Sequence, residues 1–130
     1  MIVDTSALIA ILKQEPGWET LAHALDTLPA PCISASTYVE LSIVVDRWKN
    51  PTLSSRVEEL IEQFHIVIEP LTPEQARIAR SAYRDYGRNS GHRANFNFGD
   101  CFSYALARAR REPILFKGDD FIHTDLRPAV

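Results

Sequence analysis

The sequence lacks any apolar run long enough to cross a membrane, and its two cysteines lack the spacing of a metal site. Asp4 and Lys13 interrupt the apolar residues at the N-terminus, unlike a secretory signal peptide, and no run approaches the roughly 18 residues of a membrane span. Cys32 and Cys101 form no CxxC or Cys/His pair, so no structural zinc site is expected. We therefore expect a cytoplasmic protein with no membrane association and two buried, reduced thiols.

The chain also lacks an excess of positive charge, because 17 acidic residues outnumber 14 lysines and arginines and give a net charge of -3. This balance argues against a protein that holds nucleic acid by charge alone. It leaves room for a metal-dependent nuclease, in which clustered carboxylates offset the basic residues in the total.

A length of 130 residues and a hydrophobic content of 45% predict one domain over residues 1–130, which is long enough to bury its own core. Short apolar runs at 1–3, 32–34, 65–69 and 113–116 predict strands. Helical spacing predicts helices that begin near residues 8, 18, 36, 53, 73 and 100. Alternating strands and helices are typical of a three-layer α/β/α domain with a mostly parallel central sheet. The unbroken run Ile66-Val67-Ile68 predicts a strand buried on both faces.

Asp4 stands where the first apolar strand gives way to a helix. The carboxyl ends of parallel strands are where open α/β sheets hold ligands, so Asp4 is a candidate metal ligand. The structural alternative is that Asp4 only caps the following helix, a position that favours Asp.

Two further acids lie in helices. Glu40 is the only charge in an apolar helix that otherwise looks packed on most faces, and a buried Glu needs a cation, a proton or a metal. Asp100 lies in the first turn of the last long helix. The alternatives are a partly exposed Glu40 and an Asp100 that only complements the helix dipole.

Asp119 and Asp120 follow the last predicted strand and therefore lie, like Asp4, at the carboxyl end of a strand. The structural alternative is a simple turn, for which Asp is a favoured residue. A single site for Mg²⁺ or Mn²⁺ explains all of these acids together, since both ions prefer oxygen ligands. Without metal the carboxylates would repel one another, so at least one should have a raised pKa.

Four segments resemble PIN-domain ribonucleases, and most closely the VapC toxins of bacterial toxin–antitoxin modules. They are Ile2–Ala7, Tyr38–Leu41, Asn97–Ala105 and Phe116–Phe121. The resemblance implies an endoribonuclease that uses Mg²⁺ or Mn²⁺, with Asp4, Glu40 and Asp100 as catalytic and metal-binding acids. The fourth acid would be Asp119, with Asp120 as the alternative. Arg93 departs from the Gly-His-Pro start often found in the preceding loop of the family.

The same resemblance implies that Thr5 and Ser6 orient the Asp4 carboxylate from behind, with a helix cap as the alternative for Thr5. It also implies an antitoxin whose C-terminal segment blocks the site with a basic residue, and a homodimer formed through helix faces. Four apolar residues are candidates for that dimer contact: Trp18, Leu21, Leu25 and Trp48.

A row of arginines suits an RNA backbone. Arg77, Arg80, Arg84 and Arg88 recur at offsets of 0, 3, 7 and 11, which places them on one helix face. His92 and Arg93 continue the row through the loop toward Asp100, so Arg84, Arg88, His92 and Arg93 are candidate RNA contacts. The alternative is a solvated face that pairs with nearby acids.

Clustered acids at strand ends also occur in three other classes of protein: metal-binding proteins of the same fold, DNA nucleases and phosphotransfer receiver domains. A binding protein of the same fold would hold metal without cleavage, and a DNA nuclease would use the same acids, since a metal site binds phosphate and not sugar. A phosphotransfer receiver domain needs paired acids after its first strand, where this chain has Asp4 alone. The histidines lie in different predicted elements, so no Ser/His/Asp or Cys/His nucleophile is expected.

Overall fold

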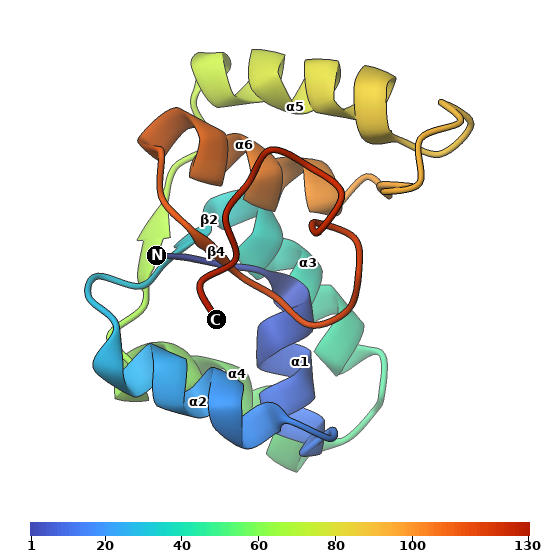
Figure 1. Cartoon of the computed structure of the whole chain (residues 1–130). Coiled ribbons are helices and arrows are strands. Elements are labelled where there is room, and N and C mark those ends of the chain that lie inside the picture. Colours follow the sequence, from blue (N-terminus) through green and yellow to red (C-terminus); the bar gives the residue numbers. More distant parts are fainter.

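The computed structural model describes all residues from 1 to 130 and contains four short strands and six helices (Figure 1). No helix is both long and apolar enough to cross a membrane. In chain order the elements are β1 (Ile2–Val3), α1 (Thr5–Lys13), α2 (Trp18–Thr27), β2 (Cys32–Ser34), α3 (Ala35–Asp46), α4 (Pro51–Gln63), β3 (Val67–Glu69), α5 (Pro73–Tyr86), α6 (Asp100–Arg110) and β4 (Ile114–Leu115).

The four strands form one parallel sheet in the order β3-β2-β1-β4. Ile2 pairs with Cys32 on one side and with Ile114 on the other, so β1 is a central strand. Because the strands are parallel, Asp4 and the turn after β4 lie at the same edge of the sheet. The fold class predicted from the alternation of strands and helices is confirmed.

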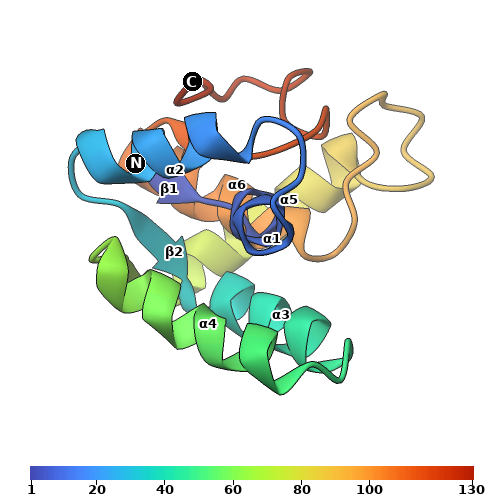
Figure 2. The same ribbon diagram turned by 90° about the horizontal axis from the view of Figure 1, so that it is seen from below.

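Alternate residues of each strand supply two separate cores, as the two-residue period of a strand requires. Val3, Ile33 and Leu115 face a core shared with α1, α2, α3 and α4. Ile2, Cys32 and Ile114 face the opposite core, which α5 and α6 cover. The views in Figures 1 and 2 agree that α5 and α6 lie on one side of the sheet, and that α3 and α4 lie side by side on the other.

Local capping explains where several helices begin. The Thr72 hydroxyl accepts a hydrogen bond of 3.1 Å from the Gln75 amide, and Pro73 occupies the first turn of α5. The Asn50 side chain caps α4 in the same manner, with Pro51 following it. These contacts confirm the helix start that Thr72 and Pro73 predict.

The prediction of a third strand buried on both faces is wrong. Val67 is 55% exposed and Ile68 is 40% exposed. β3 is an edge strand that pairs only with β2. An unbroken apolar run of three residues does not distinguish a central strand from an edge strand, because periodicity carries no information on strand order.

Part of the predicted dimer contact lies inside the molecule instead. Leu21 and Leu25 are buried in the core beneath α2, and Trp18 and Trp48 are half-buried against the same core. These residues stabilise the fold of the protomer, so Leu21 and Leu25 are not available to a second copy.

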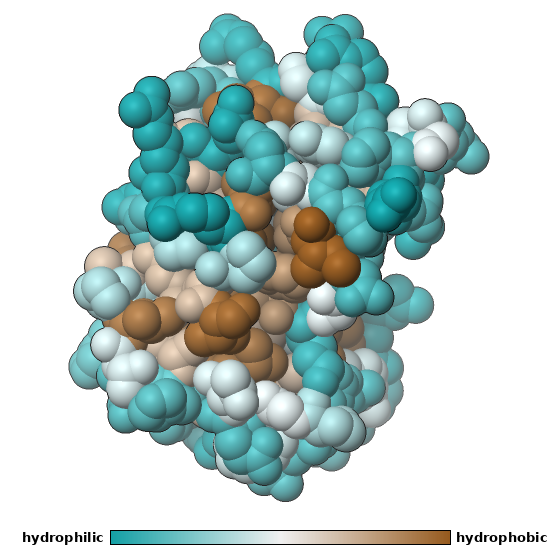
Figure 3. Space-filling model, viewed as in Figure 1, coloured by the Kyte–Doolittle hydropathy of each residue, from teal (hydrophilic) through white to brown (hydrophobic).

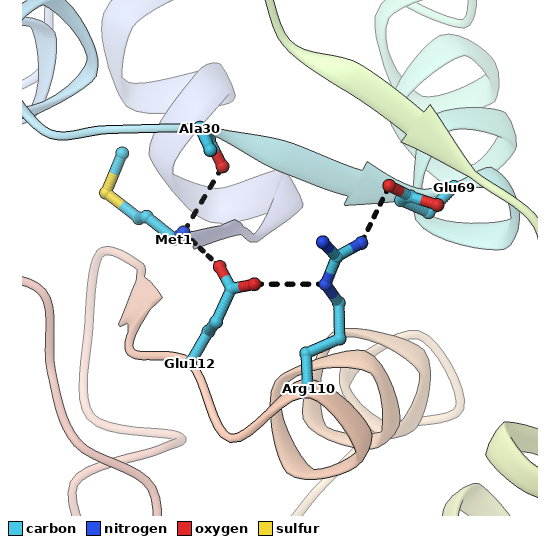
Figure 4. Close-up of polar contacts among 5 residues, drawn as sticks. All are labelled: Met1, Ala30, Glu69, Arg110 and Glu112. Atoms are coloured by element: carbon cyan, nitrogen blue, oxygen red, sulfur yellow. Dashed lines mark hydrogen bonds and ion pairs between the residues drawn. The ribbon is translucent and has the colours of Figure 1, made fainter.

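A chain of ionic contacts ties the start of β1 to α6 and to the edge strand (Figure 4). The Met1 amino group contacts Glu112 and lies 3.3 Å from the Ala30 carbonyl. Arg110 links Glu112 at 3.0 Å to Glu69 on β3 at 2.7 Å. This network fixes the C-terminal half of α6 on the sheet, while the helix presents its N-terminus to the acidic edge.

Candidate acidic active site

Asp4 caps α1 and lies buried at the carboxyl end of β1. It is 4% exposed, and its Oδ2 accepts hydrogen bonds from the Ser6 amide at 3.0 Å and the Ser6 hydroxyl at 2.7 Å. Its Oδ1 accepts a 2.6 Å bond from the Ser103 hydroxyl on α6. Two hydroxyls therefore hold the carboxylate from two different elements, and Asp4 caps the helix as the structural alternative predicted.

The Ser6 hydroxyl is itself oriented by the end of β4. The Lys117 amide donates a 3.0 Å hydrogen bond to Ser6 Oγ. Because that oxygen accepts from Lys117, its proton is directed to the Asp4 carboxylate. The expected role of Ser6 is thus consistent with its contacts.

Glu40 projects from α3 toward the same edge. Thr5 donates a 2.7 Å hydrogen bond to Glu40 Oε1, and Asp4 is the cap of α1. The role that the resemblance implied for Thr5, to orient Asp4, is therefore wrong, and so is the alternative of a helix cap. Burial raises the pKa of Glu40, the Thr5 bond opposes the rise, and the charge of Asp4 adds to it. The carboxylate also lies against Gly99, where an added Cβ would come within 1.5 Å of Oε2.

Asp100 is buried at the first turn of α6, where Asn97 holds it by a reciprocal pair of bonds. The Asn97 amide donates to Asp100 Oδ2 at 2.8 Å, and the Asp100 amide donates to Asn97 Oδ1 at 2.9 Å. Burial raises the pKa of Asp100 to about 7, against the bond from Asn97, and the charges of Asp4, Asp120 and Glu40 contribute to the rise. The expected mutual repulsion of the acids is therefore present.

The two C-terminal acids differ in their surroundings. Desolvation first, and then the charges of Asp4 and Asp119, raise the pKa of Asp120, while Arg88 lowers it. Asp120, not Asp119, is among the charges that raise the pKa of Asp100. These charge interactions favour Asp120, which the resemblance offered only as the alternative, over Asp119.

Four carboxylates from separate parts of the chain therefore interact through their charges at one edge of the sheet: Asp4, Glu40, Asp100 and Asp120. None of the four forms an ion pair with a lysine or arginine. As they stand, no three acidic, histidine or cysteine side chains are grouped closely enough to enclose a metal ion. The donor set is nonetheless all oxygen and mutually repelling, which fits a hard divalent cation.

Three further residues contact the acids and were not predicted from the sequence: Asn97, Gly99 and Ser103. Ser103 is fully buried beside Asp4, and the Thr37 hydroxyl lies 3.3 Å from Ser103 Oγ. Ser103 follows Asp100 by three positions, so both lie on one side of α6, and it belongs to the segment Asn97–Ala105 that carries the family resemblance. Asn97 and Gly99 had no signal beyond their place in the segment that precedes the helix.

The four candidate RNA contacts, Arg84, Arg88, His92 and Arg93, differ in their surroundings and in their relation to the acids. Arg84 pairs with its neighbour Asp85 at 2.9 Å on the exposed face of α5. Arg88 is close enough to Asp120 to lower its pKa, so it connects the basic loop with the acidic edge. His92 packs edge-on against Tyr86 and accepts a 3.1 Å bond from the Ala94 amide, whereas Arg93 is exposed. Arg88 is therefore the candidate best placed beside the acids.

An apolar groove of about 550 Å³ begins beside Glu40 and Gly99. Its walls include Val39 and Ile43 of α3, which are 52% and 53% exposed, together with Phe98 and Phe102. The expectation that α3 is packed on most faces is therefore wrong, because one apolar side faces solvent. That side leads directly to a member of the acidic cluster.

Comparisons with known proteins agree with this arrangement. The family model described as PIN domain matches residues 1–126. Ribonuclease VapC28 of Mycobacterium tuberculosis is 52% identical over 130 residues, which cover 100% of this chain and 98% of that protein. Ribonuclease VapC42 of the same species is 50% identical over 129 residues, covering 99% and 98% of the two chains.

Solved structures share the fold at lower sequence identity. The crystal structure of VapC20 from Mycobacterium tuberculosis, described as a sarcin-ricin loop cleaving toxin, superposes with a TM-score of 0.72 at 18% identity and covers 98% of both chains. A toxin–antitoxin complex from Klebsiella pneumoniae gives a TM-score of 0.66 at 18% identity, covering 92% of this chain and 88% of that one. These likenesses support the arrangement of helices and strands described above.

Proposed function

Because this chain belongs to the PIN-domain family, among the VapC ribonucleases, we propose that it is the toxin of a type II toxin–antitoxin module and cleaves RNA at its acidic edge. The observation that carries the proposal is the convergence of Asp4, Glu40 and Asp100 at one edge of the sheet, where burial, together with the charges of Asp4, Asp120 and Glu40, raises the pKa of Asp100 to about 7. Self-repelling carboxylates of this kind are costly without a cation, so their presence together supports a metal-binding role.

We assign Mg²⁺ or Mn²⁺ as the cofactor, with Asp4, Glu40 and Asp100 as its protein ligands and Asp120 as the fourth acid. Asp119, which the sequence favoured, becomes the alternative. When bound, the ion supplies positive charge that stabilises the scissile phosphate and lowers the pKa of water. No side chain serves as nucleophile.

The residues around the acids fix their geometry. Ser6 and Ser103 orient Asp4, Thr5 orients Glu40, and the Asn97 amide orients Asp100. Hydrolysis then forms a bond from water oxygen to phosphorus and breaks the bond from phosphorus to a ribose oxygen. Arg88 extends toward the acids from the loop after α5 and would hold the RNA backbone.

We further propose that a cognate antitoxin covers the apolar groove of Val39, Ile43, Phe98 and Phe102. Its apolar side chains would occupy the groove, and a basic residue would reach Glu40 and Asp100 at the end of it. The charge of the acids and the continuity of the groove with them support this occupant. A single domain over 1–130, a homodimer and a cytoplasmic location stay predictions.

Cleavage of defined RNAs in Mg²⁺ or Mn²⁺, with and without EDTA, tests the function. Wild type should cleave only with metal, Asp4→Asn and Asp100→Asn should lose cleavage, and Asp26→Asn on the exposed side of α2 should keep it. Activity that survives chelation, or that is equal in all variants, overturns the mechanism. Cleavage of a DNA of the same sequence would identify a DNA nuclease. Metal binding without cleavage of RNA or DNA would identify a binding protein.

A further inference from the structure

A polar cleft of about 780 Å³ lies between α5 and α6, and none of the four clustered acids lines it. Arg77 and Tyr86 of α5 form one wall, and Tyr104 and Arg108 of α6 form another. Asp125, in the segment after β4 that crosses in front of α6 in Figure 1, forms the third. The cleft thus combines two helices with the C-terminal segment.

The cleft follows the same side of α6 as the acidic site. Tyr104 and Arg108 come 4 and 8 positions after Asp100 within α6, and Arg111 is the residue that caps the end of the helix. Residues at offsets of 4 and 8 share one helix face. A rise of 1.5 Å per residue places Arg108 about 12 Å along the helix axis from Asp100, with Arg111 just beyond the helix end. The cleft therefore lies farther along α6 from the acids, toward the C-terminal end of the helix.

The cleft is lined by three arginines, Arg77, Arg108 and Arg111, and by three acids, Glu74, Asp85 and Asp125. A second polar cavity shares Arg77 with it and adds Arg80 and Arg84 on the outer side of α5. Hydrophilic residues dominate this part of the surface in Figure 3, at the top of the view. Arg77 and Arg111 form no ion pair and are exposed, so both guanidiniums are free to bind an anion.

The acids of the cleft are largely engaged. Asp125 accepts a 2.8 Å hydrogen bond from the Tyr104 hydroxyl and pairs with Arg108 at 2.8 Å, while Asp85 pairs with Arg84. These contacts leave Glu74 as the one unpaired acid of the lining against Arg77 and Arg111. The half-buried ring of Tyr86 adds an aromatic surface, to which nucleic-acid bases commonly stack.

We propose that this cleft is a second RNA-binding site, which holds phosphodiester groups of the substrate beyond the scissile bond. The inference rests on the proposed ribonuclease function and extends it. Arg77 and Arg111 are the main phosphate contacts. The substrate is consequently an RNA segment long enough to reach from Asp100 to Arg111, and the cleft contributes affinity that depends on salt.

Fluorescence anisotropy with a labelled 24-nucleotide random-sequence RNA tests the site in EDTA, where neither metal nor cleavage contributes. Wild type is compared with the double variant Arg77→Gln/Arg111→Gln over a series of salt concentrations. Lys49→Gln/Arg56→Gln removes the same charge from α4 and the turn before it, outside the cleft, and is the matched control. Thermal unfolding followed by circular dichroism establishes that all three proteins are folded.

The slope of log affinity against log salt should become shallower by about 1.4 in the cleft variant, the value for two lost contacts to single-stranded nucleic acid. The control should keep the wild-type slope. Equal slopes in wild type and the cleft variant overturn the second site while leaving the ribonuclease proposal intact, and so does an equal loss in both variants. Wild type that fails to bind the RNA at all overturns this inference, whereas the metal-dependent cleavage assay decides the ribonuclease proposal separately.

Discussion

The Ser103 hydroxyl donates a 2.6 Å hydrogen bond to Asp4 although the two residues lie 99 positions apart in the chain. Both are buried, and Thr37 lies behind Ser103 at 3.3 Å. This bond joins the turn after β1 to α6, the helix that also carries Asp100. The relative position of two of the acids therefore depends on a hydroxyl that belongs to neither.

Replacement of Ser103 by alanine should weaken Mn²⁺ binding and cleavage by about 10- to 100-fold, the usual cost of removing a group that orients a metal ligand. The Asp4 carboxylate would also lose a buried donor, which should lower the free energy of unfolding by about 1–3 kcal/mol. Isothermal titration with Mn²⁺ measures the first effect and urea denaturation the second.

Ser42→Ala is the matched control, because the Ser42 hydroxyl bonds only to the Tyr38 carbonyl one turn earlier in α3. It should leave Mn²⁺ affinity unchanged. A Ser103→Ala protein that binds Mn²⁺ as tightly as wild type would show that the bond serves folding alone.

Gly99→Ala should weaken cleavage without unfolding the protein. An added Cβ would lie 1.5 Å from Glu40 Oε2, and the end of a Glu side chain can rotate away at little cost. The backbone φ of -66° at Gly99 suits any residue, so the helix start itself tolerates alanine. Cleavage should fall by about 10- to 100-fold as Glu40 is displaced, with the circular dichroism spectrum unchanged.

A double-mutant cycle separates this effect from a general disturbance of the loop. On a Glu40→Ala background the clash is absent, so adding Gly99→Ala should cause no further loss of cleavage. Additive losses in the double variant would mean that Gly99 acts through something other than Glu40.

Much of the fold follows from the sequence because its signals are local. The Thr72-Pro73 start of α5 and the alternating strands and helices depend on neighbours within a few residues, and the structure has them where expected. Whether β3 is central or at the edge depends instead on strand order, which a run such as Ile66-Val67-Ile68 does not encode. The same limit explains Leu21 and Leu25, whose helical spacing fits a core as well as a dimer contact.

The candidate acids could be chosen because family motifs surround them, and Ser6 beside Asp4 was found in the same way, but the more distant partners were not. Thr5 stands next to Asp4 in sequence, yet a helix turns its hydroxyl toward Glu40, 35 positions away. Ser103 and Asp4 meet only because α6 packs on β1, a relationship that no local pattern contains. Contacts between distant segments are therefore the part that required the structure.

Asp120→Asn should reduce Mn²⁺ affinity and cleavage by about 10- to 100-fold, and Asp119→Asn should have a much smaller effect. The reason is electrostatic, because Asp120 interacts with both Asp4 and Asp100. The two adjacent variants carry the same change of charge and serve as controls for each other. The reverse order of effects would restore Asp119 as the fourth acid.

Stability without metal should depend on pH through Asp100. Its pKa is raised from 3.8 in the unfolded chain to about 7 in the folded protein, so the folded state binds a proton more tightly. The resulting stabilisation is fully present below about pH 4 and is lost as pH rises through about 7. It amounts to at most about 4 kcal/mol.

Asp100→Asn removes this dependence, because an amide can accept the Asn97 bond but carries no charge. In EDTA, the variant should therefore gain stability relative to wild type by about 2–3 kcal/mol between pH 5 and pH 8.5, as measured by urea denaturation. Asp26→Asn, an exposed change on α2, should follow wild type at every pH. A constant difference in stability between Asp100→Asn and wild type over this range would mean that Asp100 is ionised throughout. The pKa of Asp100 would then not be raised, which contradicts the prediction.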